Sequence, residues 1–436
     1  CASITAMYNR LKKKDLSVGM LHSKALYFLY KDNEDYEGAK EQYQAFKYFT
    51  KHITIATTHQ IFKALFNCKF NEMMLSIFKD STFIIDEIHC YNEKEVALIL
   101  TSLKYLKEYY NIRICIMSAS IPTKLLDLIK EELDINKVLR LTEQELIRIK
   151  RHRVEYRSKL IEEDIEVIKQ AIKEGKRVIV CVNTVQQSVY LYKLLKPIVK
   201  ENEITLINSY FNQRDRERIE KELNDVRVLV GTQAIEVSLD IDFDELYTEV
   251  SPIDSQIQRW GRVNRKRVKD LIERKNIFVY DTESSIYDES IIIRTKKLLR
   301  ELEYIEEKDI QKYLDTVYVE DFEDYKKYKH IMDSEILTNI SMGIWDNDYN
   351  EYNKFTGVSV LPMDLEMEYK QFLNDNKYYD ANSLLVNIPI WQFERSKEDN
   401  AIVLEEFVKG HQEYVILYKY NSKEGLQIGV KESKFF

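Results

Sequence analysis

Residues 83–89 read Phe-Ile-Ile-Asp-Glu-Ile-His, an apolar run that ends in two acidic side chains. The apolar run predicts a buried strand, and Asp86 and Glu87 follow at its carboxyl end. Ligands of open parallel sheets bind at the carboxyl ends of the strands. In a nucleotide-hydrolysing domain the first acid would hold Mg²⁺ and the second would orient water. The alternative is a solvated turn with His89 as a packed histidine, and the position after the strand favours the functional interpretation.

The sequence on both sides of this strand alternates between short apolar runs and helical stretches. Residues 53–56 and 112–117 have the composition of buried strands, and residues 93–110 have helical periodicity. Such alternation is typical of an α/β domain with a parallel sheet. After a charged stretch at 141–153 the pattern starts again, with a helix at 162–174 and strands at 154–157, 178–182, 205–207, 226–230, 245–248 and 277–280. The predicted fold class is α/β, with two successive parallel sheets.

The character of the sequence changes beyond Glu283. A predicted helix at 290–303 is followed by acidic, tyrosine-rich sequence and by predicted strands at 355–361, 384–389, 413–420 and 426–430. We interpret this part as a smaller α+β region, and its aromatic side chains, with Trp391 and Phe393 among them, mainly as packing residues. The predicted domains are therefore 1–148, 149–284 and 285–436.

Composition limits the class of protein. The 436 residues suggest two or three domains, and the formal net charge is −8. This acidic balance argues against a protein that coats duplex DNA by bulk charge, although residues 259–269 form a local basic patch. No apolar run reaches the length of a membrane span, and the first residues lack the pattern of a signal peptide. The five cysteines match no zinc spacing. Cys115 and Cys181 lie in apolar runs, so we expect buried free thiols in a cytoplasmic protein.

A second polar cluster lies at 258–265, which reads Gln-Arg-Trp-Gly-Arg-Val-Asn-Arg. Arg262 and Arg265 are three residues apart, so on a helix both side chains project from one face. The fork of a guanidinium group suits the charge that develops on a γ-phosphate during hydrolysis. The alternative is a basic helix face that lies in water. Arg259 and Lys266 fit this alternative best.

Four segments resemble the motifs of superfamily 2 helicases, in the same order. Residues 86–89 resemble motif II, 118–120 motif III, 231–240 motif V and 258–265 motif VI. Within the superfamily the chain most resembles the CRISPR-associated helicase-nuclease of type I interference. Segments 182–185, 208–211 with 215–216, 240–244 and 251–254 carry this closer likeness. The resemblance implies that the two parallel sheets are tandem RecA-like domains and that the C-terminal region is an accessory domain.

The resemblance also implies roles for individual residues. Asp86 and Glu87 would coordinate Mg²⁺ and activate water, and His89 would act with them in catalysis and couple the nucleotide to nucleic acid. Gln258, Arg262 and Arg265 would reach ATP from the second domain, with Asp240 at the same cleft. Short polar side chains would hold the nucleic-acid backbone without reading bases. These are Thr57, Thr58, Ser118, Ser120, Asn183, Thr184, Thr232 and Gln233.

Two motifs of the family are missing from the chain. The sequence contains no Gly-x-x-x-x-Gly-Lys-Ser/Thr. By the resemblance, this phosphate loop lies upstream of residues 1–7, which resemble the latter part of motif Ia. Without the loop, we expect residues 1–436 alone to hydrolyse ATP poorly or not at all. The family's nuclease carries a His-Asp pair, and none of the seven histidines here precedes an aspartate. We therefore expect no nuclease activity from this chain.

The leading hypothesis is an ATP- and Mg²⁺-dependent translocase on single-stranded DNA that unwinds target DNA for degradation. By the resemblance, a guide-RNA surveillance complex of type I CRISPR systems would recruit it. A metal-dependent nuclease domain, fused upstream or separate, would act with it. Two alternatives stay open: an RNA or DNA-repair helicase of the same superfamily, and a catalytically silent module that binds nucleic acid.

Overall fold

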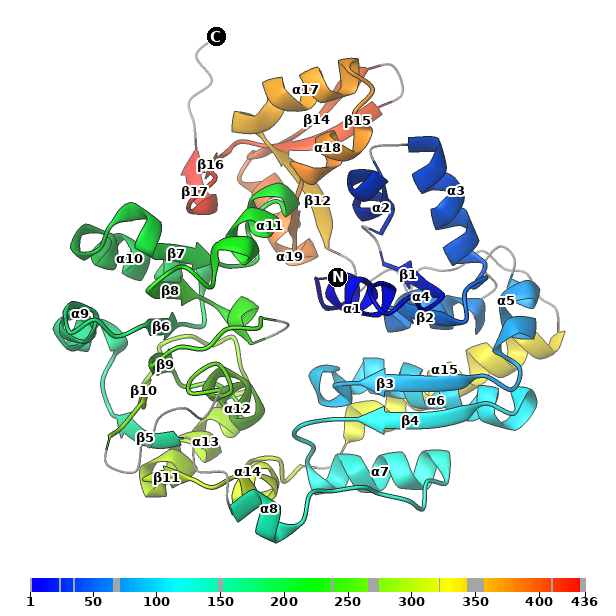
Figure 1. Cartoon of the computed structure of the whole chain (residues 1–436), viewed down its shortest axis with the longest axis horizontal. Coiled ribbons are helices and arrows are strands. Elements are labelled where there is room, and N and C mark those ends of the chain that lie inside the picture. Colours follow the sequence, from blue (N-terminus) through cyan, green and yellow to red (C-terminus); the bar gives the residue numbers. More distant parts are fainter. Residues whose placement is uncertain are drawn as a thin grey trace. The chain divides into compact units, whose positions relative to one another are not determined.

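The computed structural model forms two compact units, and the chain passes between them three times. Unit 1 comprises Cys1–Arg140 and Val319–Asn353, and unit 2 comprises Leu141–Tyr318 and Lys354–Phe436 (Figure 1). The structure describes residues 2–22, 25–33, 36–65, 71–147, 152–236, 239–265, 274–320, 322–342, 357–408 and 411–431. Among these, no helix has the length and apolarity of a membrane span. The domain boundaries at 148/149 and 284/285 stay predictions.

Unit 1 contains two pairs of parallel strands. Strand β1 (Val18–Leu21) pairs with β2 (Ile53–Ala56), and β3 (Thr82–Asp86) pairs with β4 (Arg113–Met117). The helices are α1 (Ala2–Lys12), α2 (Ala25–Asn33), α3 (Tyr36–Lys47), α4 (Thr58–Phe62), α5 (Asn71–Phe78), α6 (Glu93–Tyr110), α7 (Thr123–Leu133) and α15 (Glu323–Met342). The predicted strands at 53–56, 82–85 and 112–117 are confirmed to within one residue.

Helix α6 is the central helix of unit 1, and its bounds match the predicted 93–110. Its start is fixed by a capping box, in which the Asn92 side chain accepts from the Glu95 N–H at 3.0 Å and the Glu95 carboxylate accepts from the Asn92 N–H at 3.1 Å. Such a cap stabilises a helix by about 1 kcal/mol. Helix α15 packs on α6, and the Tyr325 N–H donates to the Glu93 carboxylate at 2.9 Å.

The β3–β4 pair is buried on one face only. Phe83 and Ile85 point into the core with α6, whereas Ile84 is 61% exposed. Because successive strand residues point to opposite faces, the cross-strand neighbour of Ile84, Cys115, lies on the exposed face too. The expectation of a buried Cys115 was therefore wrong. An apolar run shows that a strand is apolar on both faces, but not that both faces are covered.

Thiol labelling of the native chain should separate these cysteines. Cys181 is buried in the core of unit 2, as expected, and burial raises the pKa of its thiol to about 12. Cys90 and Cys115 are exposed. We expect iodoacetamide at pH 8 to modify Cys90 and Cys115 within minutes and Cys181 only after unfolding, because the thiolate is the nucleophile. Peptide mass spectrometry reads the sites, and rapid native modification of Cys181 would contradict the structure.

Unit 2 is built on a seven-stranded sheet with the strand order β11-β5-β10-β9-β6-β8-β7. The strands are β5 (His152–Arg157), β6 (Val178–Cys181), β7 (Ile204–Ile207), β8 (Val228–Gly231), β9 (Glu245–Glu249), β10 (Ile277–Tyr280) and β11 (Tyr304–Ile305). All pairs are parallel except β11 with β5, which confirms the second parallel sheet. Strands β6, β8, β9 and β10 are buried along their whole length, as parallel strands covered on both faces are.

Helices surround this sheet. They are α8 (Glu143–Ile147), α9 (Ile165–Lys173), α10 (Val185–Leu195), α11 (Gln213–Glu222), α12 (Ile253–Trp260), α13 (Glu289–Glu301) and α14 (Ile310–Val317). Side chains of α13 and α14 belong to the same hydrophobic core as the sheet. All six predicted strands of this region exist, with ends that differ by up to two residues.

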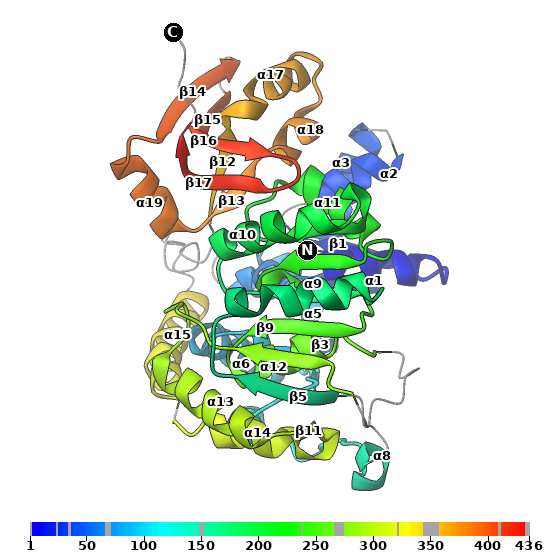
Figure 2. The same ribbon diagram turned by 90° about the vertical axis from the view of Figure 1, so that its left-hand side faces the viewer.

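The C-terminal region adds a four-stranded sheet and a hairpin. Its order is β13 (Val386–Ile388), β12 (Val358–Pro362), β15 (His411–Ile416), β14 (Ile402–Val408), and the hairpin is β16 (Tyr418–Asn421) with β17 (Gly425–Lys431). Helices α17 (Glu366–Asn374), α18 (Tyr378–Ser383) and α19 (Ile390–Glu398) accompany them (Figure 2). The smaller α+β region is thus confirmed.

The aromatic residues of this region divide into two groups. Tyr418, Tyr420 and Phe393 are buried, as expected. Trp391 is 62% exposed, so its assignment to the core was wrong. The segment forms helix α19, and the helical turn places Trp391 and Phe393 on different faces.

The hairpin is attached to helix α11 and to the loop before it. The Tyr420 hydroxyl donates to the Asp215 carboxylate at 2.6 Å, and the Leu426 N–H donates to the Tyr210 carbonyl at 3.0 Å. The accessory region is therefore part of the same compact unit as the second sheet.

Candidate functional site

The two acids of unit 1 stand at the carboxyl end of β3, in solvent. Asp86 is the last strand residue, and Glu87 follows with φ 53° in the left-handed region. Both residues are exposed. A non-glycine residue in this region costs about 1–2 kcal/mol, so the turn holds Glu87 in an unfavourable backbone conformation. Such local strain is frequent at functional sites.

His89 connects this acid pair to the end of the neighbouring strand. Its Nδ1 lies 2.6 Å from Ser118 Oγ and 3.3 Å from a Glu87 carboxylate oxygen. The Ser118 hydroxyl also donates to the Ser120 carbonyl at 2.9 Å. The structure thus brings together the residues that resemble motifs II and III, which the sequence separates by 29 positions.

The donor set at β3 suits a magnesium ion that shares its ligands with a nucleotide. Within the described residues no group of three or more His, Cys, Asp or Glu side chains gathers to hold a metal. Magnesium in nucleotide sites typically uses one or two carboxylates, with water and phosphate oxygens for the rest. The exposed carboxylates of Asp86 and Glu87 fit that pattern, and no protein cage is required.

Thr57 and Thr58 begin helix α4, directly after β2. Thr57 is the N-cap residue and is half-buried, whereas Thr58 is 8% exposed. Thr58 also hydrogen-bonds the Tyr91 side chain, whose pKa is raised mainly by burial. Ser120 is 3% exposed. Of the four nucleic-acid residues predicted in unit 1, Thr57 and Ser118 are thus the more accessible.

The predicted residues of unit 2 meet at the carboxyl edge of the sheet. Asn183 and Thr184 follow β6, and Thr232 and Gln233 follow β8. Thr184 caps α10 by accepting from the Gln187 N–H at 3.2 Å. Gln233 donates to the Asn183 carbonyl at 3.2 Å and to the Tyr287 hydroxyl at 2.9 Å. Residues 237 and 238 of the motif V segment lie outside the described part of the chain.

Asn183 and Thr232 are buried rather than facing solvent. Their exposed fractions are 2% and 3%. The Asn183 side-chain amide donates to the Val250 carbonyl at 2.9 Å. The main-chain N–H of Asn183 donates to the Glu249 carboxylate at 2.6 Å. Burial raises the pKa of Glu249. In this conformation Asn183 serves the internal network, and its contact with nucleic acid stays a prediction.

Arg262 and Arg265 follow α12 and contact the loop after β8. Arg262 donates to the Ile235 carbonyl at 3.2 Å, to the Leu239 carbonyl at 2.6 Å and to the Glu236 carbonyl. Arg265 donates to the Leu239 carbonyl at 3.3 Å, and its guanidinium lies 3.5 Å from the Asp240 carboxylate, which is 95% exposed. Gln258 is half-buried on α12.

Arg259 was one of the two residues that best fitted the alternative of a solvated helix face, and the structure contradicts this. Its exposed fraction is 0%, and its guanidinium pairs with Glu236 at 2.8 Å. Arg259 lies on the buried face of α12, three residues after Gln256, which is buried too. Glu236 and Glu249 were not predicted as site residues either. Lys266 and the rest of the basic patch to residue 269 lie outside the described residues.

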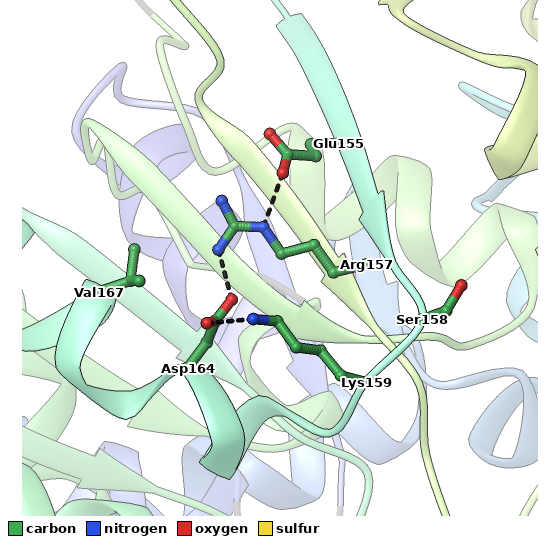
Figure 3. Close-up of a pocket in the computed structure, with 6 residues that line it drawn as sticks. All are labelled: Glu155, Arg157, Ser158, Lys159, Asp164 and Val167. Atoms are coloured by element: carbon green, nitrogen blue, oxygen red, sulfur yellow. Dashed lines mark hydrogen bonds and ion pairs between the residues drawn. The ribbon is translucent and has the colours of Figure 1, made fainter.

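A pocket of about 480 Å³ lies at β5, and none of the predicted site residues lines it (Figure 3). Its charged lining consists of Glu155, Arg157, Lys159 and Asp164. Arg157 donates to Glu155 at 2.8 Å and to Asp164 at 2.5 Å, and Lys159 pairs with Asp164 as well. Two cations and two carboxylates neutralise one another, so the pocket offers no net charge to a polyphosphate.

Comparison with known proteins identifies relatives. A family model described as DEAD/DEAH box helicase matches residues 7–128, and one described as CRISPR-associated nuclease/helicase Cas3, C-terminal, matches residues 174–268. The CRISPR-associated nuclease/helicase Cas3 of Methanothermobacter thermautotrophicus is 30% identical over 345 residues, which cover 74% of this chain and 40% of the relative. A putative Cas3 of Methanocaldococcus jannaschii is 29% identical over 72% of this chain and 46% of the relative. The chain thus spans less than half the length of these curated relatives.

The fold has solved counterparts as well. The crystal structure of T. fusca Cas3 with AMPPNP aligns with a TM-score of 0.69 and 16% identity, and the alignment covers 98% of this chain and 64% of that one. This likeness supports two RecA-like parts with an accessory region.

Proposed function

Since the chain belongs to the CRISPR-associated Cas3 helicase family, we propose that it forms most of an ATP-driven motor that moves along single-stranded DNA. One observation carries the proposal. Polar and charged side chains gather beside a parallel sheet in each unit: Asp86, Glu87 and His89 at and just after the carboxyl end of β3 in unit 1, and Arg262 and Arg265 against the loop after β8 in unit 2. A module that only binds nucleic acid needs neither the acids nor the arginines.

In unit 1 the acids act on the phosphate end of ATP. Mg²⁺, when bound with the nucleotide, supplies positive charge against the phosphate oxygens. Asp86 would hold the ion, and the Glu87 carboxylate would accept a hydrogen bond from the attacking water and orient it. His89, hydrogen-bonded to Ser118, would link this site to the strand end that carries the motif III residues.

In unit 2 the arginines would stabilise charge on the γ-phosphate. Arg262 now donates to three main-chain carbonyls, so reaching a phosphate requires it to exchange some of these acceptors. Gln258, Arg265 and Asp240 would line the same nucleotide edge. Thr57, Ser118, Thr184 and Gln233 are the half-buried candidates for contact with the phosphates of a DNA strand.

Partners follow from the family and are part of the proposal. The curated relatives carry the name nuclease/helicase, so we propose that a metal-dependent nuclease works with this motor, either fused or separate. The strand to be degraded would be presented by the guide-RNA surveillance complex of a type I CRISPR system.

ATP hydrolysis tests the proposal directly. The sequence contains no Gly-x-x-x-x-Gly-Lys-Ser/Thr, so we expect no turnover by residues 1–436 with Mg²⁺, with or without single-stranded DNA. A longer protein that joins this chain to a phosphate-loop segment should hydrolyse ATP, and single-stranded DNA should stimulate it. Turnover by residues 1–436 alone would require a different phosphate site. A longer protein without turnover would favour the silent binding module.

A further inference from the structure

The guanidinium group of Arg259 joins three strand ends inside unit 2. It donates to the Glu236 carboxylate at 2.8 Å, to Thr248 Oγ1 at 2.8 Å and to the Asn183 side-chain oxygen at 3.2 Å. A fourth bond reaches the Glu249 carbonyl at 3.1 Å. These partners come from the ends of β6 and β9 and from the turn after β8. A single buried charge therefore fixes the geometry of the carboxyl edge of the sheet.

Glu236 is held by two arginines of the same segment. Its carboxylate accepts from Arg259, and its main-chain carbonyl accepts from Arg262. Burial raises the pKa of Glu236, and the nearby charge of Arg259 opposes that rise. The turn that carries Gln233 is thus tied at its end to the segment that carries Arg262.

Gln233 reaches the same network from the other side. Its side chain donates to the Asn183 carbonyl, while the Asn183 side-chain oxygen accepts from Arg259. A displacement of Gln233 by a bound strand would therefore act on Arg259 through Asn183 and Glu236. Arg262 contacts the carbonyl of Glu236 and would respond to the same displacement.

We infer that Arg259 is a positioning residue that couples the nucleic-acid side of this edge, at Gln233, to the nucleotide side, at Arg262. The inference rests on the proposed function, because it assigns DNA to Gln233 and ATP to Arg262. A purely structural ion pair would stabilise unit 2 and leave the stimulation of hydrolysis by DNA unchanged. The two roles therefore differ in one measurable ratio, the turnover of ATP with DNA over that without DNA.

A double substitution separates the roles in the longer protein that carries the phosphate loop. Arg259→Met alone leaves Glu236 buried without its cation and is expected to lower Tm strongly. Arg259→Met with Glu236→Leu removes both charges, and we expect most of the loss in Tm to be recovered. This folded double variant should keep its KM for ATP, and the stimulation of kcat by single-stranded DNA should fall by about tenfold.

The matched control is the pair Arg227 and Glu203, whose side chains lie 3.4 Å apart at the opposite, amino-terminal edge of the sheet. Arg227→Met with Glu203→Leu should keep the full stimulation. Should the Arg259 double variant not fold, Arg259→Lys retains the charge and loses the fork, and its stimulation should fall as well.

Full stimulation in the folded double variant, or in Arg259→Lys, would overturn the inference and leave the proposed function intact. A wild-type protein that does not hydrolyse ATP would overturn the proposed function, and this inference with it.

Discussion

Arg262→Lys is expected to lower the kcat of ATP hydrolysis by about 10³-fold in the protein that carries the phosphate loop, with single-stranded DNA saturating. Lysine retains the positive charge but loses the planar fork that meets two phosphate oxygens at once. Arg262 is half-buried and follows α12. Its side chain contacts the loop after β8. The charge that it would stabilise develops in the transition state, so KM for ATP should change much less than kcat.

The substitution also removes hydrogen bonds to the carbonyls of residues 235, 236 and 239, so stability has to be measured beside activity. A Tm close to that of the wild type would exclude unfolding as the cause of the loss. Arg216→Lys is a matched control, because Arg216 is half-buried like Arg262 and forms an i,i+4 pair with Glu220 on α11. If Arg262→Lys lowers kcat by less than about tenfold, Arg262 does not stabilise the γ-phosphate, and this role would be assigned to Arg265.

Local patterns in the sequence predicted the elements well. Helix α6 was found from its helical periodicity, and the structure shows that Asn92 and Asn111 cap it. The strands of the second sheet were found because parallel strands covered on both faces are continuous apolar runs. Strands β1, β11 and β14 were missed. β1 is only four residues long and includes Gly19, and β14 mixes glutamates with apolar residues at an edge of its sheet.

What the sequence could not supply is the environment of each side chain. Arg259 and Arg262 belong to one short motif, yet one is fully buried and the other half-buried. Their partners are Glu236 and the carbonyls of a loop more than twenty residues earlier, which no local pattern identifies. In the same way, Asn183 resembled a ligand-facing residue, and its position inside a network of strand ends became visible only in three dimensions.

The second large effect is expected from Glu87→Gln. This substitution should lower the kcat of ATP hydrolysis by about 10²–10⁴-fold, which leaves no measurable turnover. Glutamine has the shape of glutamate, but it cannot accept a proton from the attacking water. The Glu87 side chain is 51% exposed, and the buried His89 beside it keeps its hydrogen bond to Ser118, so Tm should change little. Binding of ATP and of single-stranded DNA should persist, because neither depends on proton transfer.

The comparison with neighbouring acids decides what Glu87 does. Asp86→Asn should mainly raise the Mg²⁺ concentration needed for half-maximal turnover, since Asp86 is assigned to hold the ion. Glu131→Gln, at an exposed position on α7, should behave as the wild type. A Glu87→Gln protein that retains more than about a tenth of the wild-type rate would show that water is activated elsewhere. The left-handed backbone of Glu87 would then serve only the turn that brings His89 to Ser118.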